Sequence, residues 1–130
     1  MRIVTCSVTA LALAAALSGA RDAAAHHSIG GEFETGREVT VEGVVKEFHL
    51  INPHSYIVVA VGADGEALRD WTLTYGPATK LIRGAGFTPT TLVPGDVVIA
   101  RGRPARQGLG LYLSALAKAD GTKLLRGLEE

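Results

Sequence analysis

From Arg37 onward, the chain spaces its apolar residues as β-strands do. Alternating apolar and polar residues, or a short apolar run bounded by turn residues, are typical of strands. Five strands are predicted, at 37–50, 54–61, 67–75, within 92–102 after a turn at Pro94-Gly95, and at 109–119. A second Asp-Gly turn opens 120–125, which ends in a short closing strand.

Between the third and fourth predicted strands the apolar spacing becomes helical. Pro77 suits the first turn of a helix, so 77–83 is predicted to be helical, with Gly84 and Gly86 ending it. Three strands, a short helix and two further strands are typical of a small OB-type Greek-key barrel of five to six strands. An open antiparallel sheet or a sandwich is the alternative.

The predicted third strand carries the apolar side chains expected to fill the barrel. Trp71, Leu73 and Tyr75 share one face of this strand. We expect them to point into the core together with Val58 or Val59, Leu81, and Val97 or Val98. In the first strand, Gly43 before Val44-Val45 breaks the alternation and predicts a bulge or a bend.

The first 25 residues have the composition of a secretory signal peptide. Arg2 precedes an apolar stretch from Ile3 to Leu17, and small residues allow cleavage after Ala20 or after Ala25. The stretch is short for a bilayer span, so an uncleaved anchor is the weaker alternative and no stable membrane span is expected after processing. The expected location is the periplasm or the medium.

After a cut at Ala25, the chain divides into an arm and a domain. Residues 26–36 contain several glycines and are predicted to be a flexible N-terminal arm, with Ile29 and Phe33 as its anchors. Residues 37–127 form the predicted barrel domain.

Composition narrows the chemistry of the mature chain. Cys6 and Met1 are the only sulfur-containing residues, and both lie in the leader. A mature chain without sulfur has no disulfide and no thiolate or thioether metal site. The 13 basic and 13 acidic residues balance, which argues against a nucleic-acid binder.

Four histidines form two compact pairs, and they are the candidate metal ligands. His26 and His27 follow Ala25, so cleavage there gives His26 a free amine that can chelate Cu(II) or Zn(II) together with its ring. His49 and His54 flank the stretch 50–53. If these four residues form the loop, the two rings stand opposite each other, with Cβ atoms about 5 Å apart, and can share a metal. A turn cap at His54 and a rim position for His49 are the structural alternatives.

Two loops are candidates for contact with a ligand. In OB barrels, the connection between strands one and two and the connection between strands four and five flank the binding face. The first of these carries Asn52 and Pro53, and the second, "GRPARQG" at 102–108, carries Arg103 and Arg106.

Several landmarks resemble one known family. They include "AHHS" after the leader, "INPHSY" at 51–56, "GPATKLIRGAGF" at 76–87 and "LVPGDVV" at 92–98. The chain resembles a family of small exported bacterial proteins catalogued as a domain of unknown function, DUF6152. The resemblance implies a compact β-rich domain outside the cytoplasm and implies no activity. The aromatic residue usual before Asn-Pro-His is replaced here by Leu50-Ile51.

These features support three functional hypotheses. The first is a non-enzymatic exported binding protein that holds a divalent metal, Cu(II) or Zn(II), through histidines. The second is a copper-dependent oxidative enzyme whose histidine brace consists of the His26 amine, its ring and a further histidine. The third is a metal-free adaptor that binds an anionic or extended partner through Arg103 and Arg106.

Overall fold

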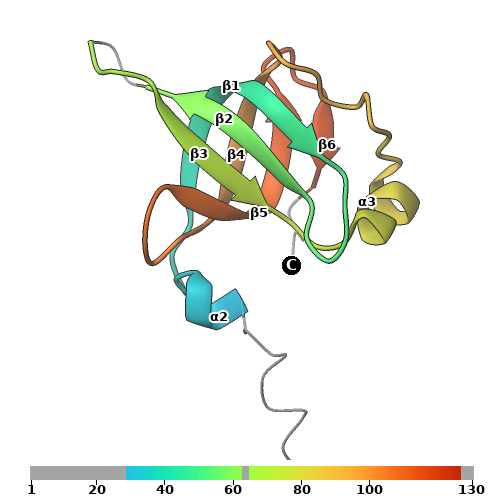
Figure 1. Cartoon of the computed structure of the whole chain (residues 1–130), viewed down its shortest axis with the longest axis horizontal. Coiled ribbons are helices and arrows are strands. Elements are labelled where there is room, and N and C mark those ends of the chain that lie inside the picture. The colour runs from blue at the N-terminus through green and yellow to red at the C-terminus, as the bar shows by residue number, and fades with distance from the viewer. Residues whose placement is uncertain (1–28, 63–64, 127–130) are drawn as a thin grey trace, which may run out of the picture.

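The computed structural model describes residues 29–62 and 65–126. The predicted signal peptide, His26 and His27 lie outside the described residues. Figure 1 shows strands wrapped around one core, with a helix at one end of the barrel. The elements in chain order are α2 (Ile29–Glu32), β1 (Val39–His49), β2 (Tyr56–Val61), β3 (Arg69–Thr74), α3 (Ala78–Ala85), β4 (Val97–Pro104), β5 (Gly110–Lys118) and β6 (Lys123–Leu125).

The strands form a closed barrel of the OB type. Their order is β3-β2-β1-β4-β5-β6, and a parallel pairing of β3 with β5 closes the first five into a barrel. This connectivity, with α3 between β3 and β4, confirms the predicted OB-like fold and excludes the open sheet. The short β6 extends the sheet beyond the barrel by pairing with β5.

The helix and one loop differ from their predicted limits. Gly84 lies inside α3, and Gly86 ends it, with a φ of 68° in the left-handed region that glycine tolerates. The predicted polar loop at 102–108 is shorter than expected, because β4 continues through Pro104. Arg103 is therefore a strand residue, paired with Tyr112 of β5.

The core largely follows the predicted faces. Leu73, Val59, Leu81 and Val98 are each at most 2% exposed, as expected. Trp71 and Tyr75 pack against the same cluster but are only half-buried, so neither is enclosed in the core as predicted. Trp71 lies just before the residues of β3 that pair with β5, and Tyr75 lies just after the end of β3. Truncation of Trp71 is therefore expected to cost less than that of a fully enclosed aromatic residue.

Two close approaches shape the long strands. The β1 ladder shifts register between Val45 and Glu47, which places the predicted irregularity just after Gly43. At Gly43 a Cβ atom would lie 2.8 Å from the Ala60 carbonyl oxygen, so β1 and β2 approach closely there. At Gly102 a Cβ atom would collide with the backbone of Tyr112. Both positions therefore require glycine.

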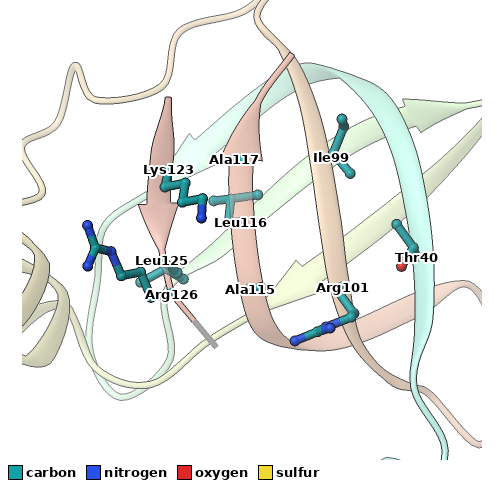
Figure 2. A pocket seen from close by; sticks show the side chains of 9 residues that line it. All are labelled: Thr40, Ile99, Arg101, Ala115, Leu116, Ala117, Lys123, Leu125 and Arg126. Atoms are coloured by element: carbon teal, nitrogen blue, oxygen red, sulfur yellow. The ribbon is translucent and has the colours of Figure 1, made fainter. Parts of the chain in front are cut away.

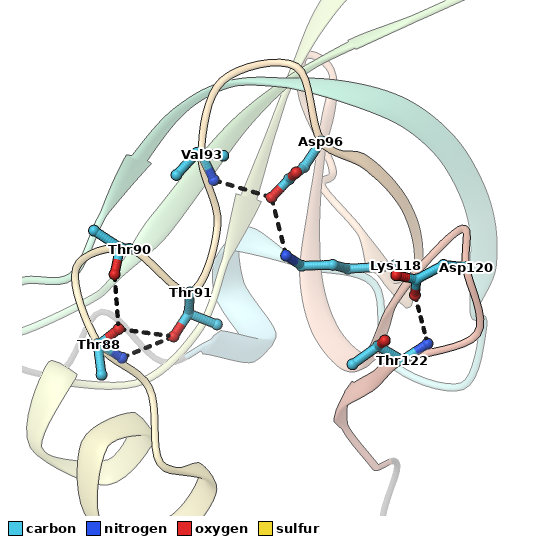
Figure 3. A network of polar contacts seen from close by, with 8 residues as sticks. All are labelled: Thr88, Thr90, Thr91, Val93, Asp96, Lys118, Asp120 and Thr122. Carbon is cyan, nitrogen blue, oxygen red and sulfur yellow. Dashed lines mark hydrogen bonds and ion pairs between the residues drawn. The ribbon is translucent and has the colours of Figure 1, made fainter.

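A carboxylate organises the turn that leads into β4. Figure 3 shows that the Asp96 carboxylate accepts a hydrogen bond from the Val93 amide, at 3.0 Å, and lies 3.2 Å from the Lys118 ammonium. The Val93 amide, and then Lys118, lower the pKa of Asp96 below its ordinary value of 3.8. The ionised carboxylate is therefore favoured in the folded state.

This turn predicts an acid-sensitive contribution to stability. Because folding lowers the pKa of Asp96, its stabilising effect is complete above pH 3.8 and is lost as the pH falls through 3.8 toward the lowered pKa. We expect Asp96→Asn to lower the thermal midpoint at pH 7 and to flatten its decline between pH 5 and pH 3. The measurement is thermal unfolding across that range, with the exposed Glu66→Gln as control. An Asp96→Asn variant with an unchanged decline would contradict this assignment.

Candidate functional site

One row of outward-facing side chains crosses five neighbouring strands of the barrel. The ladders pair His49 with Tyr56, Tyr56 with Thr74, Thr74 with Tyr112 and Tyr112 with Arg103. Directly paired residues present their side chains on the same face of a sheet. We call this set of five residues the aromatic row.

The neighbours of the row show that it faces outward. Ile57, Leu73, Leu111 and Leu113 alternate with its members along β2, β3 and β5, and each is at most 3% exposed in the core. The members themselves are all half-buried. The side chains of the row are therefore held in place by the barrel strands and remain accessible from outside.

Stacked rings and cations give the row its character. The rings of His49 and Tyr56 are stacked, with centroids 4.4 Å apart. Tyr75, which follows β3, lies beside Tyr112 with ring centroids 6.3 Å apart and planes 21° apart. The Arg103 guanidinium carbon is 5.3 Å from the Tyr112 centroid, and Lys80 Nζ is 5.6 Å from the Tyr75 centroid. The rings therefore pack against one another and are flanked by the positive charges of Arg103 and Lys80.

The β1–β2 loop is fixed by a buried serine. Ser55 is 1% exposed, and its hydroxyl donates to the Ile51 carbonyl at 3.0 Å and accepts from the Ile51 amide at 3.3 Å. The Ser55 amide donates to Gly76, and the Ser55 carbonyl accepts from the Tyr75 amide. The loop base is thus tied to the segment that carries Tyr75, although sequence reasoning assigned Ser55 no role.

The predicted His49–His54 geometry is wrong. Tyr56, not His54, pairs with His49, because β2 begins two residues later than a four-residue loop would require. His49 Nε2 lies 2.9 Å from a Glu47 carboxylate oxygen. Asn52, Pro53 and His54 are exposed, and the Asn52–Pro53 peptide is cis. Among the described residues, no three His, Cys, Asp or Glu side chains are grouped to hold a metal ion.

The other predicted loop residues have separate roles. Arg103 belongs to the aromatic row. Arg106 instead holds the N-terminal arm, since its guanidinium donates to the Gly30 carbonyl at 3.2 and 3.3 Å. Arg106 also donates its amide to the Glu32 carbonyl. The predicted pairing of Arg103 and Arg106 at one ligand loop is thus not what the structure shows.

The described part of the arm docks next to the aromatic row. Phe33 is 8% exposed, pairs with Ala105 and lies against Tyr112 with ring centroids 5.5 Å apart. It is therefore the anchor that the sequence predicted, whereas Ile29 is half-buried. The arm reaches the β4–β5 connection rather than the β1–β2 loop. The histidine brace stays a prediction, because His26 and His27 lie outside the described residues.

Sequence reasoning missed Tyr56, Thr74 and Tyr112 as members of a site. Tyr112 stands between two buried leucines in "LYL", and Tyr56 precedes a buried isoleucine. This alternation marks both tyrosines as outward-facing aromatics, which is the signal that could have found them. Their alignment across strands depends on register, which the sequence alone leaves open.

Comparisons with known proteins bear on the fold and the family. No curated protein matches the chain. A small single-stranded DNA-binding protein from Streptomyces coelicolor is structurally similar at 20% sequence identity and a TM-score of 0.47, over 63% of this chain and 90% of that chain. At that score the similarity carries no functional argument, so the expectation of no nucleic-acid partner stays a prediction. Within the described residues, no helix is long and apolar enough to span a membrane.

The family is shown by a match over most of the chain. The model of a family of unknown function, DUF6152, matches residues 14–113. This span includes the aromatic row, the β1–β2 loop and the whole of α3. The chain therefore belongs to the DUF6152 family.

Proposed function

We propose that this protein is a non-enzymatic binding module, exported from the cytoplasm, that holds an acidic oligosaccharide across the aromatic row. The observation that carries the proposal is the register that aligns His49, Tyr56, Thr74, Tyr112 and Arg103 across five strands. A continuous row suits an elongated ligand better than a compact one.

The side chains of the row, together with Lys80 beside it, support a sugar with carboxylate groups. OB barrels bind oligonucleotides and oligosaccharides on the face of their second and third strands, where Tyr56 and Thr74 of the row lie, and on the loops beside that face. Half-buried tyrosine side chains offer a sugar both exposed apolar ring area and a hydroxyl group for hydrogen bonding.

Arg103 and Lys80 supply the charge that carboxylates require at the Tyr112 end of the row. The Glu47 carboxylate, by contrast, lies beside His49 at the other end. A nucleic acid needs several phosphate contacts, and the balanced charge of the chain does not favour it.

Export is supported by the leader at residues 1–25. We expect the protein to be recovered from the periplasm or the medium, with a mature chain that begins at His26. Mass spectrometry of the intact exported protein checks both points. A mature chain that begins at Arg21 would move the cut to Ala20 and remove the His26 amine as a metal ligand. Retention of Met1 would contradict cleavage.

The binding proposal predicts a loss of affinity when the row is interrupted. Calorimetric titration of tetragalacturonate should show saturable binding to the wild type. Tyr112→Ala and Arg103→Gln should each weaken it at least about tenfold, equal to about 1.4 kcal/mol. Each variant removes one part of the row, a ring or a charge, so both losses have a direct physical cause.

The controls separate this proposal from its competitors. His54→Ala alters an exposed loop residue outside the row and should leave affinity unchanged. A neutral tetrasaccharide should bind more weakly than tetragalacturonate. Tighter binding of an oligothymidylate would replace the sugar by a single-stranded nucleic acid. The absence of binding to either polymer below about 1 mM would reject the row as their site.

Metal binding through histidines is a second candidate function. The contact between His49 Nε2 and Glu47 Oε2, 2.9 Å long, favours it because it brings together an imidazole and a carboxylate, two groups that ligate Zn(II) or Cu(II). The affinity for either metal, measured by titration, should then fall in His49→Ala. It should fall in His54→Ala as well if the exposed His54 is a ligand. Metal affinity unchanged in both variants would leave His26 and His27 as the remaining ligands.

A further inference from the structure

A groove separate from the aromatic row crosses the outer face of β4, β5 and β6. Its volume is about 520 Å³, within the usual range for small-molecule sites. Figure 2 shows Ile99 and Arg101 on one side of it and Lys123 and Arg126 on the other. We call it the alanine groove, because Ala115 and Ala117 lie between the two sides. None of the residues that line the groove belongs to the aromatic row.

The sequence explains why a groove forms here. The ladder pairs Ile99 with Ala117 and Arg101 with Ala115, so the two alanines face outward beside long side chains. On the other side, β6 pairs only through Leu116–Leu125 and Ala117–Lys123. Larger residues at 115 and 117 would fill the space between Ile99 and Lys123. The two methyl groups therefore leave an apolar floor between two raised walls.

The charge of the groove has one sign. Arg101, Lys123 and Arg126 line it, and no carboxylate does so among the described residues. Arg101 is already paired with Glu38, at 3.2 Å between Nε and Oε2, on the side toward β1. Lys123 and Arg126 therefore supply the positive charge that faces the groove from the β6 side. Two cations suit a ligand with one anionic head.

We propose that the alanine groove is a second binding site, which takes an alkyl carboxylate. The alkyl chain lies along Ala115, Ala117 and Ile99, and the carboxylate contacts Lys123 and Arg126. Ile99 is 40% exposed, and the bound chain would cover its apolar surface. This inference does not depend on the oligosaccharide proposed for the aromatic row.

The test uses decanoate as the probe. Nuclear magnetic resonance titration of the wild type should give saturable shifts at the amides of Ala115, Ala117 and Lys123. Ala117→Leu fills the floor and should weaken binding at least about tenfold. The double variant Lys123→Gln with Arg126→Gln removes both charges and should weaken it to a similar extent. Folding of each variant is checked by its thermal midpoint.

Matched controls make each outcome decisive. Arg69→Gln with Arg83→Gln changes the net charge equally at exposed sites outside the groove and should leave decanoate binding unchanged. Decanol should bind more weakly than decanoate, because it lacks the charge. Equal binding of decanol would reject the anionic head, and shifts centred on Tyr112 would place the site elsewhere. An absence of saturable shifts up to about 5 mM would overturn the proposal.

Discussion

Leu73→Ala is expected to lower the free energy of unfolding by about 2–5 kcal/mol. Leu73 is 0% exposed and belongs to the buried core cluster, where the surrounding structure relaxes only partly around a truncated side chain. The cost combines the lost burial of the side chain with the cavity that remains. Urea unfolding followed by fluorescence measures it, because Trp71 is the only tryptophan of the chain.

A second leucine provides the control. Leu68 is 70% exposed at the entrance to β3, so Leu68→Ala makes the same chemical change without a cavity. Its effect should stay within about 0.5 kcal/mol. Similar losses for the two variants would show that the core is not centred on β3, and the barrel described above would then be wrong.

Gly102→Ala is expected to cost more than about 3 kcal/mol. A Cβ atom at this position would lie 2.8 Å from the Tyr112 carbonyl carbon and 3.1 Å from Leu113 Cα, and it would overlap the Tyr112 carbonyl oxygen. All three atoms belong to the backbone of β5, so no side-chain rotation relieves the collision. We also expect Tyr112 to shift, which should weaken any ligand bound to the aromatic row.

Gly84→Ala is the matched comparison. Gly84 lies in α3, and nothing stands within 4 Å of the Cβ atom that alanine would add. Alanine is the better helix former, so this variant should be neutral or up to about 1 kcal/mol more stable. The expected opposite signs of the two glycine variants check the close approach of β4 to β5. A neutral Gly102→Ala variant would contradict it.

The fold could be predicted because its elements are encoded locally. Local patterns give the limits of most elements to within a few residues. Examples are the alternation in 109–119, the helical spacing after Pro77 and the Gly-containing turns. Together they give the order of strands and helix, which is typical of one barrel. The end of β4 could not be predicted in the same way, because "GRP" at 102–104 has the composition of a loop. The contact with β5 across Gly102 keeps this segment in the sheet.

The candidate site could be predicted only in part, because it depends on register. Arg103 was identified from its place near the β4–β5 connection, which is a sequence-local property. The opposition of His49 and His54 rested on an assumed loop length, and two more residues in the loop moved Tyr56 into that place. The partnership of Tyr112 with Thr74 joins strands far apart in the sequence. No local pattern specifies such a pairing.

The aromatic row crosses the weakest closure of the barrel. β3 and β5 are joined by three residue pairs, whereas β2 and β3 share six and β4 and β5 share seven. Thr74 and Tyr112 form one of those three pairs. A ligand along the row would therefore bridge β3 and β5 and stabilise this seam, the pairing at which the closed barrel would open into a sheet. Occupancy should then slow hydrogen exchange at Thr72 most, whose amide bonds to Leu109 across that seam. Opening of the seam would in turn separate the two halves of the row and release the ligand.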